Sequence, residues 1–233
     1  MVGVIWVVMG MTVMHAALAQ GISPSVTPTV DTGLGSRPTP TGTLVLSSSV
    51  TAIGDSVMLG AVGELRKTIA GINVDAAKSR QMREATRILA TRQVSATLGD
   101  IVIVHIGNNG PINAKLFDAM MQPLRDIKFV VIVNVKVSRP WEAGNNIVLA
   151  EGVKRYPNAL LLDWNALIST NMDLLAVDGT HLGAKSAKLY ASAVAQVLSE
   201  WNAAKPTVFS TSEVGASAAT ATPQSWSGSQ HPR

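Results

Sequence analysis

The sequence predicts an α/β fold: a three-layer α/β/α sandwich around a mostly parallel, five-stranded sheet. Three observations predict this fold. Hydrophobic residues make up 47% of the 233 residues and charged residues 15%, which is enough for one sizeable core. Short apolar runs alternate along the chain with segments of helical spacing. Several runs are apolar at consecutive positions, as expected of strands that helices cover on both faces.

The five expected strands are the apolar runs Val50–Gly54, Ile72–Ala76, Ile101–Gly107, Phe129–Val135 and Ala159–Trp164. We expect a helix after each strand. Helical spacing of apolar residues is clearest at Met58, Leu59, Val62, Leu65 and Ile69, at Leu116, Ala119, Met120 and Leu124, and along Ala184–Asn202. This alternation predicts right-handed crossovers. Ligands then bind outside the carboxyl ends of the strands, so the loops there should carry the chemistry.

The two ends of the chain differ from this middle part. Residues 1–19 contain no charged side chain, and the Ala-Leu-Ala at 17–19 is typical of a signal-peptide cleavage site. We expect 1–19 to be a signal peptide or membrane anchor, or the end of the last membrane helix of a longer product. Residues 20–47 are an expected Pro/Ser/Thr-rich linker, 48–204 the folded domain and 205–233 a disordered tail. This organisation predicts an exported protein of the cell envelope, anchored or secreted.

Composition excludes several kinds of site. The chain has no cysteine, which rules out disulfides, thiolate nucleophiles and iron–sulfur clusters. It has no metal-ligand cluster, phosphate-binding glycine loop or dinucleotide fingerprint, so we expect no metal and no cofactor. The net charge of +4 is small, and no basic run is interleaved with aromatic residues. Nucleic acid is therefore not an expected partner.

Ser56 is the candidate nucleophile. It follows the first strand in Gly54-Asp55-Ser56, at the turn into the first helix. A serine at a helix N-terminus has its own N–H in a region of partial positive charge, which favours a developing oxyanion. The alternative is an ordinary helix cap, because Asp and Ser are both good capping residues.

A serine nucleophile needs a base, which is usually histidine. Of the four histidines, His15 lies in the apolar leader, His231 lies in the tail, and His105 lies in a strand as an expected core residue. His181 remains, in a loop before the last helix. Asp178 is three residues before it, close enough in a turn to orient the imidazole. A plain Asp-Gly turn is the alternative.

Two further loops are candidates for an oxyanion hole. Gly107–Gly110 follows the third strand and offers side-chain amides that could donate to an oxyanion. Lys78–Gln81 follows the second strand and offers backbone N–H groups. The alternatives are a Gly/Asn turn for the first loop and a helix start capped by Ser79 for the second.

Together the four loops resemble the SGNH (GDSL-like) hydrolase superfamily. More narrowly, they resemble the extracytoplasmic SGNH domain of acyltransferase family 3 proteins, as in peptidoglycan O-acetyltransferases. The resemblance rests on Ala52–Met58, Asp75–Ala76 with Ser79–Gln81, His105–Gly110 and Asp178–His181. Residues Val135–Glu142 resemble a further segment of the O-acetyltransferase branch. The resemblance spans about residues 48–202 and implies an SGNH-type α/β/α fold.

The resemblance implies a role for each matching residue. Ser56 becomes the nucleophile, His181 the base and Asp178 its orienting partner. The oxyanion hole is formed by the Ser56 N–H, Asn109 and a donor from Ser79. Ser79 stands where typical SGNH hydrolases have glycine.

The resulting expectation is an exported, serine-dependent O-acyltransferase that moves an acetyl group through an acyl-serine to hydroxyls of cell-wall glycan. Its partners would be an acyl donor, a glycan acceptor, the membrane through residues 1–19, and a membrane acyltransferase that supplies acyl groups. Arg139 and Trp141 could shape the acceptor site, although Trp141 could equally pack on the core. The alternatives are an SGNH esterase that hydrolyses acyl or carbohydrate esters, and a non-catalytic cell-wall module.

Overall fold

The structure is a computed structural model that describes residues 42–204. The expected leader, most of the expected linker, the expected tail and the two terminal histidines lie outside these residues. Within residues 42–204, no helix is long and apolar enough to cross a membrane.

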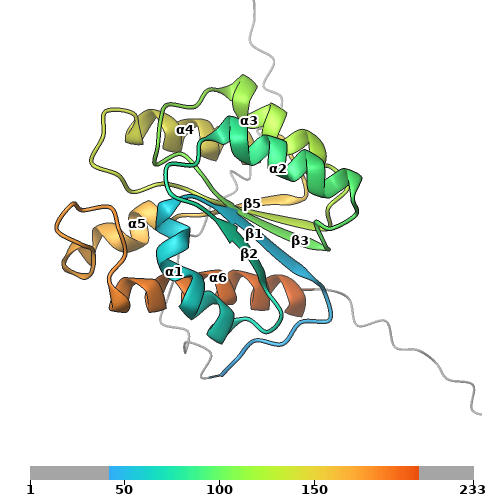
Figure 1. The fold of residues 1–233 in the computed structure, drawn as a ribbon, viewed down its shortest axis with the longest axis horizontal. Coiled ribbons are helices and arrows are strands. Elements are labelled where there is room, and N and C mark those ends of the chain that lie inside the picture. Colours follow the sequence, from blue (N-terminus) through green and yellow to red (C-terminus); the bar gives the residue numbers. More distant parts are fainter. Residues whose placement is uncertain (1–41, 205–233) are drawn as a thin grey trace, which may run out of the picture. The chain divides into compact units, whose positions relative to one another are not determined.

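The described residues form one sheet of five parallel strands, which confirms the predicted α/β fold (Figure 1). The strands are β1 (Val50–Gly54), β2 (Asn73–Ala76), β3 (Ile101–His105), β4 (Phe129–Val133) and β5 (Ala159–Leu162). Their order in the sheet is β2-β1-β3-β4-β5. The chain therefore moves outward in one direction from β1 and in the other from β3. The carboxyl ends of β1 and β3 lie at the point where the order reverses, which is where such sheets bind ligands.

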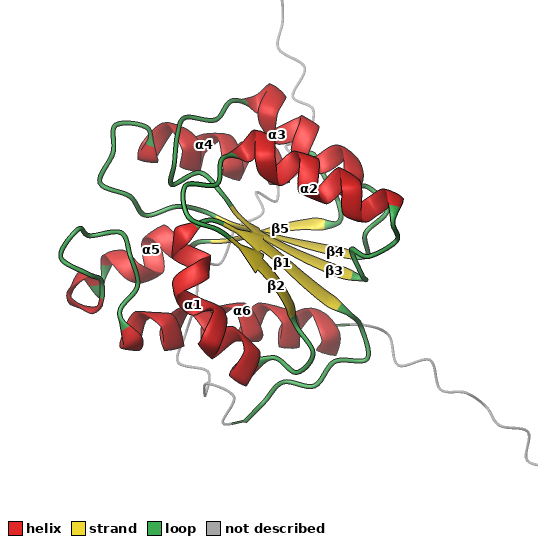
Figure 2. Ribbon diagram, viewed as in Figure 1, coloured by secondary structure: helices red, strands yellow, loops and turns green. Residues whose placement is uncertain are grey.

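Helices cover both faces of the sheet and complete the predicted three layers. They are α1 (Ser56–Thr68), α2 (Met82–Val94), α3 (Ala114–Met121), α4 (Glu142–Val153), α5 (Trp164–Ser169) and α6 (Ala184–Ala203), with short 3-10 helices at Gln122–Leu124 and Met172–Leu174. Helices α1, α5 and α6 lie on one face, and α2, α3 and α4 on the other (Figure 2).

The consecutive apolar residues of the strands are explained by a hydrophobic cluster on each face. Ile101 and Ile103 belong to the cluster beneath α1 and α6, whereas Val102 and Val104 belong to the cluster beneath α2 and α3. Successive side chains of a strand point to opposite faces, so a strand covered on both sides is apolar at every position.

Three expected strands end two residues earlier than predicted. β3 ends at His105 because Gly107, with a φ of +136°, turns the chain. β5 ends at Leu162 because Asp163 caps α5, where its side chain accepts a hydrogen bond from the N–H of Ala166 (2.9 Å). Phe129–Val135 is likewise shortened to Phe129–Val133. The helix predicted after the fifth strand is α6, so the short helix α5 before it is an additional element.

The packed part of the chain begins before residue 48. Leu44 forms an isolated parallel bridge with Ile69 at the end of α1. Its side chain and that of Leu46 pack against the cluster beneath α1 and α6. These residues, placed by composition in the linker, therefore add to the core.

Candidate active site

Ser56 is held at the first position of α1 by the two residues before it. Asp55 is the N-cap of the helix, and its side chain accepts a hydrogen bond from the Val57 N–H (3.0 Å). Gly54 is required because a side chain there would collide with Met58. The N–H of a first helical residue has no partner within the helix. Ser56 thus presents a hydroxyl and a backbone donor beside the carboxyl end of β1.

Asp178 shapes the loop that carries His181. One carboxylate oxygen, Oδ1, accepts hydrogen bonds from the backbone N–H groups of Thr180 and His181, both at 2.9 Å. Gly179 makes the turn, with a φ of +65°. The other oxygen, Oδ2, lies 2.6 Å from Nδ1 of the His181 imidazole. The same carboxylate therefore fixes both the loop and the ring.

The other ring nitrogen of His181, Nε2, lies 3.0 Å from Oγ of Ser56. Hydrogen bonds from the His181 backbone, its side chain and the Thr180 backbone lower the pKa of Asp178 to about 2. An ionised carboxylate can only accept, so Nδ1 carries the hydrogen and Nε2 is free to accept the serine proton. The structure thus brings together the Ser56, His181 and Asp178 side chains predicted from separate loops.

Ser79 and Asn109 line a cavity that Ser56 also lines. Its volume is about 550 Å³, and its remaining lining residues are His181, Leu59, Gly60 and Lys78. Ser79 has a φ of +58°, a left-handed conformation that glycine adopts without strain. Ser79 therefore has a strained backbone at the position where glycine is typical of the SGNH superfamily, which the sequence resembles.

A buried arginine, which the sequence analysis does not single out, anchors this loop. Arg80 donates from Nη1 to the carbonyl oxygens of Gly54 (3.1 Å) and Asp75 (2.6 Å), and from Nη2 to the Asp75 carboxylate (2.7 Å). Its own carbonyl oxygen accepts a long hydrogen bond of 3.4 Å from Nδ2 of Asn109. Arg80 therefore joins the ends of β1 and β2 to the loop after β3.

A second buried residue, Asn145 of α4, holds the loop that carries Asn109. Its Nδ2 donates to the carbonyl oxygens of Gly107 (2.8 Å) and Gly110 (2.9 Å), and its Oδ1 accepts from the Ile112 N–H (2.8 Å). Sequence reasoning missed Asn145 as well. The available signal was an amide side chain within the helix expected after the fourth strand.

Arg139 and Trp141, the predicted acceptor residues, occupy different environments. Arg139 lines a cavity of about 340 Å³ whose other lining residues are Ser56, Asn108, Asn109, Val137, Ser138, Asp178, Thr180 and His181. Trp141 caps α4, is half-buried, and lines none of the cavities described in this section. The structure therefore brings Arg139, and not Trp141, to the cavity beside Ser56.

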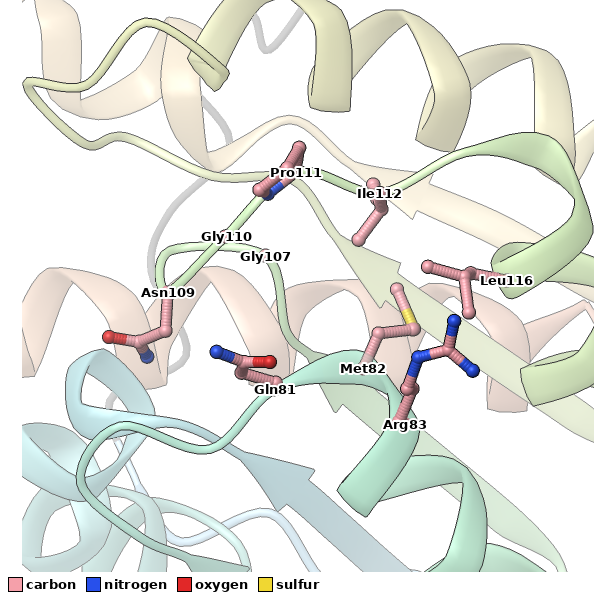
Figure 3. A pocket seen from close by; sticks show the side chains of 9 residues that line it. All are labelled: Gln81, Met82, Arg83, Gly107, Asn109, Gly110, Pro111, Ile112 and Leu116. Atoms are coloured by element: carbon pink, nitrogen blue, oxygen red, sulfur yellow. The ribbon is translucent and has the colours of Figure 1, made fainter.

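A third cavity, of about 280 Å³, adjoins Asn109 between the start of α2 and the loop after β3 (Figure 3). The amide side chains of Gln81 and Asn109 lie at one end. Three apolar side chains, those of Met82, Ile112 and Leu116, lie at the other. Neither Ser56 nor His181 lines this cavity, but Asn109 is common to all three cavities.

The part of the chain that the structure describes offers no metal cluster. Among residues 42–204, no group of three His, Asp or Glu side chains is placed to hold a metal ion. His105 is a buried core residue, as the sequence analysis expects, and its Nδ1 lies 2.9 Å from the hydroxyl of Tyr190.

No protein-family model matches the chain. Curated relatives nevertheless share its sequence. The chain is 28% identical over 152 residues to the putative peptidoglycan O-acetyltransferase YrhL of Bacillus subtilis. It is 29% identical over 149 residues to the peptidoglycan O-acetyltransferase OatA of Listeria monocytogenes. These alignments cover 65% and 64% of this chain but only 24% of each relative.

A solved structure shares the fold. The C-terminal catalytic domain of peptidoglycan O-acetyltransferase A from Streptococcus pneumoniae, determined with a methylsulfonyl adduct, superposes with a TM-score of 0.60 and 25% identity. The match covers 65% of this chain and 93% of that domain. The chain thus has the SGNH-type fold and resembles the SGNH domain of peptidoglycan O-acetyltransferases, as the sequence predicts.

Proposed function

We propose that the chain is an exported, serine-dependent O-acyltransferase that transfers an acetyl group to hydroxyls of cell-wall glycan. One observation carries the proposal: the His181 imidazole lies between the Asp178 carboxylate (2.6 Å) and the Ser56 hydroxyl (3.0 Å) at the edge of open cavities. This arrangement is that of a nucleophile, a general base and an orienting acid. The names of the relatives supply the reaction and the substrate class.

In the first step, Oγ of Ser56 attacks the acyl carbonyl of the donor, and its proton passes to Nε2 of His181. The Asp178 carboxylate stabilises the imidazolium that forms. The resulting oxyanion accepts hydrogen bonds from the Ser56 N–H, the Ser79 N–H and the Asn109 amide. The bond from Asn109 to the Arg80 carbonyl is long, at 3.4 Å, so its loss costs little when the amide turns to the oxyanion. The leaving group takes the proton from His181, and an acyl-serine remains.

In the second step, a hydroxyl of the acceptor loses its proton to Nε2 of His181 and attacks the acyl-serine. Collapse of the second tetrahedral species returns the proton to Ser56 and releases the acetylated acceptor. We assign the acceptor to the cavity lined by Ser138, Arg139 and Thr180, because its polar side chains suit a sugar. Trp141 has no place in this assignment, because it does not line that cavity.

Hydrolysis is the second candidate outcome, and the exposure of the site favours it. The side chains of His181 and Asp178 are 49% and 53% exposed. Water can therefore reach the acyl-serine unless a bound acceptor excludes it. The same residues would then catalyse an esterase reaction.

We place this activity outside the cytoplasm, with residues 1–19 as a cleaved signal peptide or a membrane anchor. The chain spans 24% of the length of the curated relatives. The chain thus matches only a small part of each relative. We therefore also propose that a membrane acyltransferase, separate from the matched part, supplies the acyl group to Ser56.

The test compares the purified chain with Ser56→Ala and His181→Ala, using p-nitrophenyl acetate with and without chitooligosaccharides. We expect each substitution to lower turnover by at least about 10³-fold. Ser169→Ala, an exposed serine in α5, is the matched control and should retain full activity. Acetylated sugar in the mass spectrum supports transfer, and acetate alone supports hydrolysis. Equal turnover in all variants would contradict the serine mechanism.

A further inference from the structure

The carboxylate of Asp55 is fully buried beneath the candidate site. Its Oδ1 accepts hydrogen bonds from the Val57 N–H (3.0 Å) and from Nδ2 of Asn108 (3.1 Å). Its Oδ2 accepts from the Asn108 N–H (3.3 Å) and again from Nδ2 of Asn108 (3.0 Å). Asp55 thus meets both the main chain and the side chain of one residue that is 53 positions away.

A helix cap alone does not explain this arrangement. Capping α1 needs one acceptor atom for one backbone N–H, and serine or threonine supplies it without a charge. Burying a carboxylate is costly unless its oxygens are hydrogen-bonded. Here the second oxygen is satisfied only by Asn108 among the hydrogen bonds of the described residues. The second oxygen therefore serves the loop after β3 and not the helix cap.

The contact between Asp55 and Asn108 is important because of where the two residues lie in the chain. Asp55 precedes Ser56, and Asn108 precedes Asn109. β1 and β3 are paired up to Gly54 and His105, and the Asp55 N–H continues the pairing by donating to the His105 carbonyl (3.2 Å). Beyond that point the two chains separate into different loops. The Asp55 carboxylate joins these loops one residue before the nucleophile and one residue before the proposed oxyanion amide.

Two fully buried residues, His105 and Tyr190, lie next to this contact. Nδ2 of Asn108 lies 3.4 Å from Nε2 of His105, whose ring stacks on Tyr190 with a centroid distance of 5.5 Å. Burial lowers the pKa of His105 and raises that of Tyr190, so both side chains are neutral. Tyr190 belongs to α6, the helix that follows the His181 loop. The contact therefore links the segments that carry Ser56, Asn109 and His181.

We propose that Asp55 is a positioning residue: its carboxylate clamps Asn108 and thereby sets the Asn109 amide against the oxygen that develops on the Ser56 adduct. This inference rests on the proposed serine mechanism. Asp55 takes no proton in the reaction and acts only through Asn108. We call the contact between these two side chains the Asp55–Asn108 clamp.

Asp55→Asn tests the clamp with a nearly isosteric change. The new side chain can still cap Val57 through its carbonyl oxygen, but its amide hydrogens would face the N–H and Nδ2 donors of Asn108. The loop carrying Asn109 then moves away from Ser56. We expect kcat for p-nitrophenyl acetate to fall about 10- to 100-fold, with KM nearly unchanged, because displacement of a positioned group costs about that much. Affinity for phenylboronic acid, which forms a tetrahedral adduct on serine, should fall by a similar factor.

The exchange Asp55→Asn with Asn108→Asp supplies the rescue. Asn108→Asp alone places two carboxylates together in a buried position and should lower both kcat and the melting temperature. In the double variant the side chains again form a donor–acceptor pair with reversed roles. We expect it to recover about tenfold in kcat over Asn108→Asp. Should Asp55→Asn not fold, Asn108→Ala removes the side-chain bonds of the clamp but leaves the cap of α1, and we expect the same fall in kcat.

A second Asp–Asn contact in the chain provides a matched control. Asp163 accepts from Nδ2 of Asn134 (2.7 Å) and from the Ala166 N–H (2.9 Å), so it too caps a helix and joins two strand ends. It joins β4 to β5 and does not contact Ser56 or Asn109. Both bonds use the same oxygen, Oδ1, so the control is Asp163→Ala, which removes both of them. Asp163→Ala should lower the melting temperature and leave kcat unchanged.

The outcomes separate the inference from the function on which it rests. If Ser56→Ala retains activity, the serine mechanism fails. If Ser56→Ala is inactive while Asp55→Asn and Asn108→Ala keep the wild-type kcat and boronate affinity, the mechanism stands and the clamp is overturned. The clamp is also overturned if Asp163→Ala lowers kcat as much as Asp55→Asn, because the effect would then be one of general stability.

Discussion

At the scale of single residues, Asp178 determines the form in which His181 meets Ser56. The substitution Asp178→Asn would keep the two bonds to backbone N–H groups through Oδ1 but place an NH₂ group against Nδ1 of the imidazole. The ring would then carry its hydrogen on Nε2 and could not accept the serine proton. We expect this variant to lower kcat for p-nitrophenyl acetate about 10³- to 10⁴-fold with little change in melting temperature. A loss smaller than tenfold would contradict this role.

The lowered pKa of Asp178 also predicts how stability depends on pH. The folded pKa of about 2 lies below the ordinary value of 3.8, so the ionised carboxylate favours the folded state. This contribution is complete above the ordinary value and is lost as the pH falls through about 2. Wild type should therefore melt above Asp178→Asn by a small margin at pH 5, and the margin should shrink as the pH falls toward 2 and vanish below it. A margin that grows on acidification would contradict the prediction.

Substitutions of Ser79 test whether its backbone N–H or its side-chain hydroxyl is the proposed oxyanion donor. Its left-handed φ of +58° is free of strain for glycine and worst for a β-branched side chain. Ser79→Gly and Ser79→Ala should keep kcat within about threefold, because the N–H remains in place. Ser79→Val should lose about 1–2 kcal/mol of stability along with activity. Loss of activity in Ser79→Ala with an unchanged urea-unfolding curve would instead indicate that the hydroxyl is the donor.

At the scale of helices and strands, the sequence predicts well those strands that are buried on both faces of the sheet. β1, β3 and β4 appear as apolar runs because each contributes to both hydrophobic clusters. The bounds of β1 are predicted correctly, but the end of β3 is not, because it depends on a single conformation, the positive φ of Gly107. Helix α5 has only six residues, too few to show helical spacing.

The residues of the candidate site also differ in whether the sequence predicts them. Ser56, Asp178 and His181 are recognisable from local motifs. Arg80 and Asn145 are not, because their partners at Gly54 and Gly107 are 26 and 38 residues away in the sequence. Nothing local separates such a buried anchor from a surface arginine or asparagine. The residues proposed to do the chemistry are thus easier to predict than those that hold them in place.

The packing of α4 on α3 depends on one glycine. A Cβ at Gly152 would lie 2.5 Å from Cε1 of the buried Phe117 ring, whereas a Cβ at Gly144 of the same helix would meet nothing within 4 Å. Gly152→Ala should lower the free energy of unfolding by about 1–3 kcal/mol. Gly144→Ala should raise it by about 0.5–1 kcal/mol, because alanine favours the helix. Urea unfolding measures both, and equal effects would contradict the packing argument.

At the scale of the whole domain, the candidate site joins segments from opposite ends of the described chain. Ser56 and His181 are 125 residues apart, yet their side chains meet at 3.0 Å. They meet because the helices that follow them, α1 and α6, share one hydrophobic cluster on the same face of the sheet. Geometry at the site is therefore a property of the folded domain, and no fragment lacking either helix should retain it.

The N-terminal boundary of that domain can be tested by truncation. Residues 42–47 add a hydrogen bond from Oγ1 of Thr43 to the Lys67 carbonyl (3.0 Å) and two backbone bonds of Leu44, to Thr68 (2.7 Å) and from Ala70 (2.9 Å). Leu44 and Leu46 also cover the cluster beneath α1. Removing these bonds and this apolar surface should cost about 2–4 kcal/mol.

We therefore expect residues 42–204 to unfold in urea at the same midpoint as residues 20–233, and residues 48–204 at a clearly lower one. Both shorter chains should hydrolyse p-nitrophenyl acetate at low denaturant, because residues 42–47 line none of the cavities described around Ser56. Equal midpoints for 42–204 and 48–204 would place the start of the domain at residue 48, as composition alone predicts. A lower midpoint for 48–204 would show that the core begins within the Pro/Ser/Thr-rich segment. Its two leucines, Leu44 and Leu46, would then suffice to hold that segment against the cluster beneath α1.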